Sequence, residues 1–156
     1  MQLAINSTIE LLIPAGALRE LEVVLIREGV LGNVAPKVIA EKLSMFEVAD
    51  GDEEIAIRLT TDPRDRFIAA TTIERGATHL LTYNTKDFDL SQSSAHCVTP
   101  DFLLAQLLDE QPIEVVRAIR QVQERYRNPA IETHQFLKVL ENLRLTRFTR
   151  DLRKLL

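Results

Sequence analysis

A predicted helix, a glycine, a short apolar strand and a polar turn follow one another in residues 62–88, and this succession restricts the fold most. Asp62-Pro63 predicts the start of the helix, and Gly76 predicts its end. Residues 78–83 (THLLTY) form a strand candidate, and residues 84–88 form a turn after it. A helix that leads into an apolar strand indicates an α/β fold, in which ligands bind at the carboxyl ends of parallel strands.

Oxygen-bearing side chains gather in this stretch. Asp65 lies in the first turn of the predicted helix, and Asn84 and Asp87 lie in the turn. Together they can direct oxygen ligands at one point, as a hard divalent cation requires. A structural interpretation competes, because Asp62 suits an N-cap, Asp65 suits a capping box, and Asn84 and Asp87 are ordinary turn formers. The local pattern alone favours the structural interpretation.

Glu20 is a further candidate ligand. Residues 9–13 predict a strand, and Pro14 opens a predicted helix that runs to Glu28. No Lys or Arg lies three or four residues from Glu20. A partly desolvated carboxylate there needs a partner or takes up a proton, and a metal ion, bound directly or through water, is one such partner. The alternative is a rim carboxylate that points to water.

Four segments, in this order and spacing, resemble the second half of a PIN domain, most closely the bacterial VapC-like branch. They read DRFIAA, GATHLLT, NTKDF and TPDFLL, and they begin at residues 65, 76, 84 and 99. The segment IELLIPAGALRE, which ends at Glu20, resembles the second element of the same domain. The resemblance covers about residues 9–108. It implies an α/β three-layer sandwich with a central parallel sheet, followed here by a C-terminal helical extension.

The resemblance also implies a chemistry. PIN domains are metal-dependent nucleases, so Glu20, Asp65 and Asp87 become the expected catalytic carboxylates. The same three residues and Asn84 become the expected ligands of Mg²⁺ or Mn²⁺, which activates water and neutralises the phosphate. Many relatives carry an acid at or near the position of Asn84, which offers only a neutral oxygen. RNA as the substrate, an antitoxin protein as a partner and a homodimer are further expectations from the family.

The family pattern begins with a hydrophobic strand that ends in a metal-binding aspartate, and no such segment precedes Ile9. Three explanations compete: the natural start lies upstream, the strand has been lost, or another chain supplies it. We favour the first, because the other acids look intact. For the chain as it stands, we expect weaker metal binding and low or absent cleavage.

The C-terminal part has the opposite charge to the rest. Residues 112–156 contain ten Lys and Arg against five Asp and Glu, and the remainder contains nine against eighteen. We therefore divide the chain into a PIN-like domain, residues 1–109, and a basic helical extension, residues 110–156. Arginines of its predicted helices are candidate phosphate contacts, which add affinity without reading sequence; they are Arg117, Arg120, Arg147 and Arg150. The alternative is a solvated helical face.

Other elements follow from periodicity and capping signals. A helix is predicted at 36–45, a strand at 46–49, an acidic helix start at 50–54 and a strand at 96–98. Thr99 predicts the cap of a helix that ends near Asp109. The extension predicts a helix stopped by Asn128-Pro129, then helices that start at Thr133 and near Thr146.

Composition places the chain among ordinary globular proteins, with 46% hydrophobic and 27% charged residues. No apolar run is long enough to span a bilayer, and no secretory signal is present. The single cysteine, Cys97, cannot form an internal disulfide. A reducing, cytoplasmic compartment and no membrane contact are therefore expected.

Three functions are compared. The leading one is a metal-dependent endoribonuclease of the toxin–antitoxin type. The second is a non-catalytic PIN-like module that binds RNA or a protein partner. A nucleotide-binding α/β domain is weaker, because neither usual glycine-rich phosphate loop occurs in the sequence.

Overall fold

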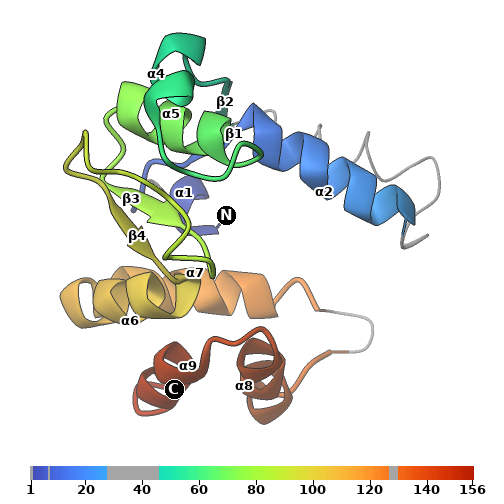
Figure 1. Ribbon diagram of the computed structural model, residues 1–156. Helices are drawn as coiled ribbons and strands as arrows, with labels where there is room; N and C mark the ends of the chain where they lie inside the picture. Colours follow the sequence, from blue (N-terminus) through green and yellow to red (C-terminus); the bar gives the residue numbers. More distant parts are fainter. Residues whose placement is uncertain (1, 7, 28–45, 127–129) are drawn as a thin grey trace. The chain divides into compact units, whose positions relative to one another are not determined.

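The computed structural model describes residues 2–6, 8–27, 46–126 and 130–156 (Figure 1). The chain divides into two compact units, each with a buried apolar cluster of its own. The helical unit consists of Met1–Glu10, Leu81–Tyr83 and Val98–Leu156. The α/β unit consists of Leu11–Leu80 and Asn84–Cys97.

Parallel strand pairs define the fold class. Strand β1 (Leu12–Pro14) pairs in parallel with β2 (Glu47–Ala49), with Ile13 opposite Val48. Strand β3 (His79–Leu81) pairs with β4 (His96–Val98). The flanking hydrogen bonds of this second pair, His96 N to Thr78 O and Thr82 N to Val98 O, advance together along both strands, as in a parallel ladder.

The predicted α/β class with parallel strands and a helical C-terminal part is confirmed. Within the described ranges the strands form two two-stranded sheets. The strands expected at 46–49 and 96–98 occur as β2 and β4. The predicted helix at 36–45 lies outside the described residues.

The first strand differs from its prediction. Residues 9–13 were expected to form it, but β1 is Leu12–Pro14 and helix α2 (Ala15–Arg27) begins directly after it. Ile9 packs instead against the apolar cluster of the helical unit. The apolar residues at 9–13 therefore do not form one strand, because Ile9 packs in the helical unit whereas Leu12 and Ile13 belong to β1.

Among the described residues, two further helices belong to the α/β unit. Helix α4 (Glu53–Arg58) is capped by Asp52, whose carboxylate accepts from the Ile55 amide at 3.0 Å. Helix α5 (Arg66–Glu74) contributes Ala69 and Ala70, both with no exposed surface, to the apolar cluster. Gly76 follows it with a φ of +61°, a left-handed conformation that favours glycine.

Helix α5 begins later than the sequence indicates. Asp62 was expected to cap it, yet residues 62–65 form a turn and the first helical residue is Arg66. The Asp62 carboxylate accepts from the Arg64 amide at 2.9 Å, a bond between residues two apart. Such a local bond competes with helix formation, and it holds this segment in a turn.

Gly51 allows the segment before α4 to approach α5 closely. A Cβ at position 51 would lie 2.5 Å from the Thr71 amide nitrogen and 2.6 Å from the Phe67 carbonyl oxygen. Both atoms belong to the backbone of α5, so neither can rotate away. The close approach therefore requires glycine.

This geometry predicts the outcome of a matched pair of alanine substitutions. Gly51→Ala should lower the free energy of unfolding by about 2 kcal/mol, because the methyl group overpacks against the backbone of α5. Gly16→Ala should be neutral or stabilising by up to about 1 kcal/mol, because Gly16 lies in α2 and its nearest neighbour, Ile68 Cγ1, is 3.7 Å away. Urea denaturation of both variants measures the difference. Equal stability would contradict the packing of Gly51 on α5.

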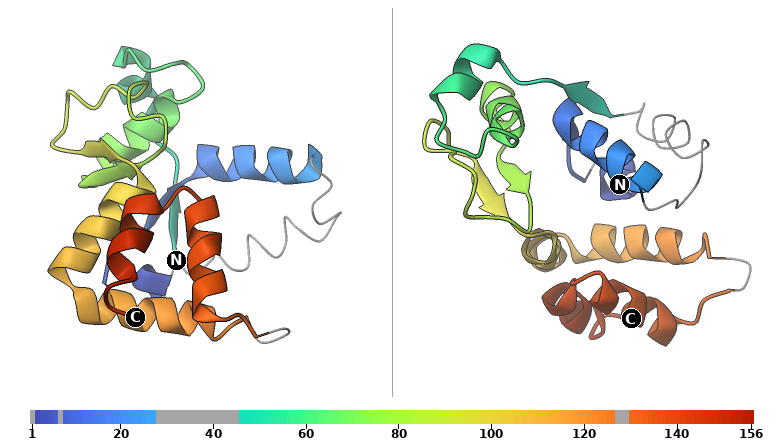
Figure 2. Two further views of the ribbon diagram at one scale, coloured as in Figure 1. Left: turned by 90° about the horizontal axis from the view of Figure 1, so that it is seen from below. Right: turned by 45° about the vertical axis from the view of Figure 1, so that its right-hand side comes forward.

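The helical unit contains five helices within the described residues. They are α1 (Gln2–Ile5), α6 (Pro100–Glu110), α7 (Pro112–Gln123), α8 (Thr133–Asn142) and α9 (Thr146–Leu152). Helices α6, α8 and α9 start where their sequence signals predict, with the Thr99 hydroxyl accepting from the Phe102 amide. Asn128-Pro129, the predicted stop of α7, lies outside the described residues. Two turned views show α9 beside α6 and α8 (Figure 2).

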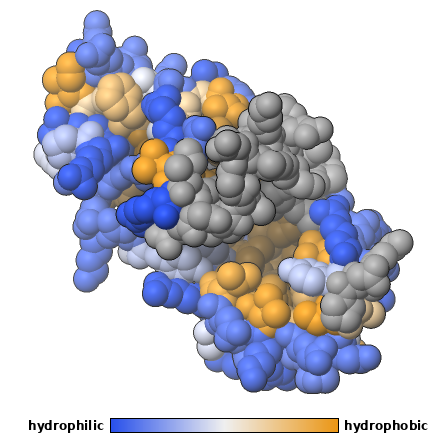
Figure 3. All heavy atoms as spheres, turned by 90° about the vertical axis from the view of Figure 1, so that its right-hand side faces the viewer, coloured by the Kyte–Doolittle hydropathy of each residue, from blue (hydrophilic) through white to orange (hydrophobic). Residues whose placement is uncertain are grey.

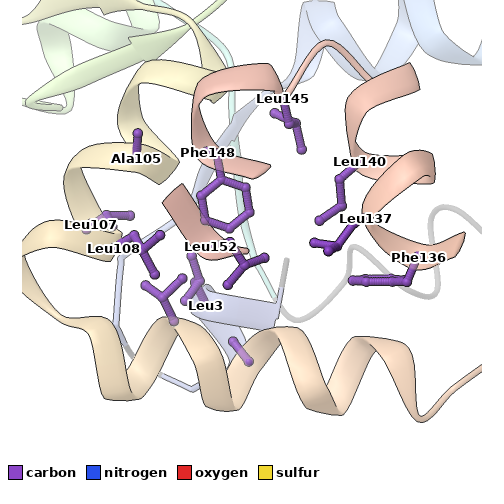
Figure 4. Close-up of a cluster of buried hydrophobic side chains, with 12 residues drawn as sticks. Leu3, Ala105, Leu107, Leu108, Phe136, Leu137, Leu140, Leu145, Phe148 and Leu152 are labelled. Carbon is purple, nitrogen blue, oxygen red and sulfur yellow. The ribbon is translucent and has the colours of Figure 1, made fainter. Parts of the chain in front are cut away.

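Large side chains fill the core of this unit. Phe148 and Leu152 of α9 have no exposed surface, and they point into a cluster with Leu108 of α6 and Leu140 of α8 (Figure 4). Asp101 of α6 fixes the start of α9, because its carboxylate accepts from the Arg147 and Phe148 amides at 3.1 and 2.8 Å. The short α9 is therefore held by a polar cap and a buried face together.

The surface is mixed. Apolar side chains interrupt the polar ones on the face drawn in Figure 3. In the part of the chain that the structure describes, no helix combines the length and apolar character that crossing a membrane requires.

Candidate functional site

Two turns of the α/β unit contribute the acidic side chains of the candidate site. Asp62 and Asp65 lie in the turn before α5, and Asn84 and Asp87 lie in the turn after β3. The Asn84 side-chain amide donates to the Asp87 carboxylate at 2.6 Å. The predicted polar turn at 84–88 is thus present, and its two site residues are in direct contact.

Asp65 is the electrostatic centre of this group. Partial burial raises the pKa of its carboxyl, the charges of Asp62 and Asp87 raise it further, and Arg64 opposes them. The structure therefore brings Asp65 and Asp87, from separate turns, within electrostatic reach of each other. Asp62 belongs to the same group, although the sequence suggested only a capping role for it. The D-P-x-D spacing, which places two acids in one turn, was the available signal.

The capping interpretation of Asp65 is not what the structure shows. Asp65 occupies the N-cap position of α5, but its side chain makes no capping hydrogen bond. Within residues 2–6, 8–27, 46–126 and 130–156, no hydrogen bond or ion pair neutralises its carboxylate. A carboxylate that is partly buried, beside other acids and without a donor is typical of a functional position.

Asp89 ties the two turns together. Its carboxylate accepts from the Ser91 hydroxyl and amide at 2.6 and 3.1 Å, and from the Thr60 hydroxyl and amide at 2.9 and 3.3 Å. Its own amide donates to the buried Thr61 hydroxyl at 2.7 Å. These bonds, those from Ser91 first, hold the pKa of the Asp89 carboxyl well below its usual range. The segment before Asp62 is thereby fixed against the segment after Asp87.

Glu20 stands apart from this group. It lies at an exposed position of α2, and it is not among the charges that raise the pKa of Asp65. Among the described residues, no three His, Cys, Asp or Glu side chains form a group that could hold a metal ion. The described contacts thus link Asp65 to Asp87 and Asp87 to Asn84, and none of them links Glu20 to this group.

The donor chemistry of the acidic group nevertheless fits a hard divalent cation. Asp62, Asp65 and Asp87 offer carboxylate oxygens, which Mg²⁺ and Mn²⁺ prefer. Their mutual repulsion, seen in the raised pKa of Asp65, is the kind of charge that a cation relieves. Asp62 and Asp87 are exposed, so their side chains can change rotamer at small cost.

The four predicted phosphate-contact arginines are all exposed, but their partners differ. Arg117 pairs with Glu114 at 2.9 Å, and Arg150 pairs with Asp151 at 3.2 Å. Arg147 lies over the Phe102 ring, with 5.5 Å between its guanidinium carbon and the ring centroid. For the guanidinium group of Arg120 the described residues provide neither a hydrogen bond nor an ion pair.

Comparison with known families identifies the chain. Residues 1–86 match the PIN domain family, and this is more than half of the chain. The chain therefore belongs to the PIN domain family. Residues 100–154 match a second family, the VapC50 C-terminal domain, so the chain is a VapC-like member. No curated protein and no solved structure gave a match. This membership points to a toxin–antitoxin nuclease.

The hydrogen bonds on the Asp89 carboxylate, here called the Asp89 clamp, predict that the stability of the protein depends on pH. Because the pKa of this group is lowered on folding, its contribution is fully present above its ordinary pKa of about 4 and declines progressively as the pH falls below that value. Asp89→Asn should therefore destabilise the protein at pH 7 and less at pH 3, where the unfolded carboxyl is mostly protonated but the folded one is still ionised. Thermal unfolding at both pH values checks this, with Glu10→Gln as the control for removing one exposed carboxylate. An equal loss at both pH values would contradict the assignment.

The raised pKa of Asp65 predicts a pH dependence of stability with the opposite sign. The folded state binds this proton more tightly than the unfolded chain does, so an ionised Asp65 lowers the free energy of unfolding. This loss of stability is present at pH 7 and vanishes below about pH 3. In a chelator, Asp65→Asn should raise the melting temperature at pH 7 and leave it unchanged at pH 3. A lower melting temperature at pH 7 would show that this carboxylate stabilises its own helix instead.

Proposed function

We propose that this chain is a metal-dependent endoribonuclease of the toxin–antitoxin type. The observation that supports it most is the un-neutralised carboxylate of Asp65, partly buried beside Asp62 and Asp87 in a member of the PIN domain family. Stability alone does not explain this group, because like charges in proximity oppose folding. Function commonly accounts for such a cost.

In this proposal Asp65 and Asp87 are the central ligands of Mg²⁺ or Mn²⁺. Asp62 and the Asn84 oxygen complete the set. Glu20, which the structure does not link to this group, is kept as a further proposed ligand, bound directly or through water, and the Glu20 variant below tests it. When bound, the ion supplies an activated water and neutralises charge on the scissile phosphodiester. The chain's own residues then have separate tasks: the carboxylates hold and orient the ion, and the Asp89 clamp keeps the two turns at a fixed separation.

RNA is the proposed substrate, and a small antitoxin protein is the proposed partner. The basic residues of the extension, proposed as residues 110–156, would contact phosphates through Arg117, Arg120, Arg147 and Arg150. Such contacts position a nucleic acid without selecting its sequence. The acidic group would then act on a backbone that other residues hold.

A cleavage assay on the full-length protein tests the proposal. Single-stranded and hairpin RNA should be cut with Mg²⁺ or Mn²⁺, and a chelator should stop the reaction. Asp65→Asn and Asp87→Asn should each reduce the rate by about 100-fold or more, because loss even of an outer partner of a metal costs about 10- to 100-fold.

Two neighbouring acids of α2 serve as a matched pair in this assay. Glu20→Gln should reduce cleavage if Glu20 belongs to the metal site, whereas Glu22→Gln should leave it unchanged. Equal rates for both variants would remove Glu20 from the site. A protein that binds the metal yet cuts neither RNA would contradict the nuclease proposal itself.

One observation favours a second candidate, a PIN-like module that binds RNA or protein without catalysis. No group of three potential ligands is assembled within the described part of the chain. This candidate predicts salt-sensitive RNA binding that survives Asp65→Asn. The cleavage assay separates the two, because a binding module leaves RNA intact at every metal concentration.

A further inference from the structure

In the helical unit, an arginine guanidinium lies over each of two exposed aromatic rings. Arg144 lies over Tyr83, with 5.6 Å from its guanidinium carbon to the ring centroid, and Arg147 lies over Phe102 at 5.5 Å. Tyr83 is 49% exposed and Phe102 is 46% exposed. Large aromatic surfaces of this kind are costly to leave in water, so a binding role is a natural explanation.

The charges of these two arginines are not neutralised by carboxylates. Arg117, Arg150 and Arg153 form ion pairs with Glu114, Asp151 and Glu141. Neither Arg144 nor Arg147 has an ion pair with any residue that the structure describes. Both therefore keep a full positive charge for an external anion.

The segment that carries both arginines is firmly held. The Tyr83 hydroxyl donates to the Leu143 carbonyl oxygen at 2.9 Å, and the Asp101 carboxylate accepts from the Arg147 amide. Leu145 and Phe148 point into the buried cluster (Figure 4). Arg144 and Arg147, which neighbour these buried residues, are thereby directed outward. They need little reordering when a ligand binds, which lowers the entropic cost of binding.

The backbone at Arg144 adds a second argument. Its φ of +63° is left-handed, a conformation in which glycine or asparagine is usual after a helix. An arginine there costs conformational energy that a glycine would avoid. The cost is explained if the guanidinium has a task on the surface.

We propose that Tyr83, Phe102, Arg144 and Arg147 form a contact surface for unpaired RNA nucleotides, here called the aromatic–arginine surface. Guanidinium planes and aromatic rings stack on unpaired bases, and the same guanidinium groups attract phosphates. Base-paired RNA keeps its bases stacked on one another, so this surface favours single strands. The proposal rests on the proposed function in that RNA is the substrate.

RNA affinity measured in a chelator tests the surface without any cleavage. Fluorescence anisotropy of a labelled ten-nucleotide single strand should show about tenfold weaker binding for Phe102→Leu and for Tyr83→Leu, because each ring supports one stacked base. The double variant Arg144→Gln/Arg147→Gln should reduce the slope of log affinity against log salt by about 1 to 2. A hairpin duplex should bind more weakly than the single strand.

Matched controls come from the same unit. Arg153→Gln removes an arginine that is already paired with Glu141, and Tyr126→Leu removes an exposed ring that packs edge-on against Phe136. Both should bind RNA within about twofold of the unchanged protein. Circular dichroism confirms that each variant is folded. Tyr83→Phe offers a second check, because it keeps the ring while removing the bond to Leu143.

Three results would overturn the proposal. The first is an unchanged RNA affinity in the folded ring variants, and the second is an equal loss of RNA affinity in the control variants. The third is competition by poly-glutamate as effective as that by RNA, which would indicate an acidic protein partner. The proposed nuclease function fails in a different way. It fails if the full-length protein binds RNA through this surface but never cuts it with metal, whereas the surface fails if cleavage persists and the ring variants bind normally.

Discussion

The carboxylate of Asp89 is the interaction on which the candidate site depends. Four hydrogen bonds from Thr60 and Ser91 converge on it, and the Thr61 hydroxyl accepts from its amide. Hydrogen bonds to a charged group are stronger than neutral ones. They offset the repulsion among the acids that they bring together. They hold the turn before α5 against the turn after β3.

The two units separate two chemistries. The α/β unit has a core of small side chains such as Ala56, Ala69 and Ala70, which allow its backbones to approach closely and hold short turns in place. The helical unit has a core of Phe and Leu, and it presents cationic and aromatic side chains outside. Acids that can bind a cation and arginines that can bind a polyanion are the two requirements of a metal-dependent nuclease.

Much of the fold was predictable because its signals are local. Gly76, Thr99 and the spacing of apolar residues located helix ends and strands from short stretches alone. The start of α5 was not predictable, because Asp62 bonds to Arg64 and forms a turn where a cap was expected. Of the candidate site, Asp65, Asn84 and Asp87 were predicted from sequence, whereas the roles of Asp62 and Asp89 depend on contacts between distant turns. The stacking of Arg144 and Arg147 on aromatic rings is likewise tertiary, and no helical periodicity could reveal it.

Direct measurement of metal binding tests the central claim most sharply. Electron paramagnetic resonance of Mn²⁺ titrated into the full-length protein reports the free ion, whose signal falls as the ion is bound. One site per chain is predicted, weakened in both Asp65→Asn and Asp87→Asn and retained in Glu10→Gln. Binding that is absent, or that is equal in all of these variants, would contradict the assignment of the acidic group as the metal site.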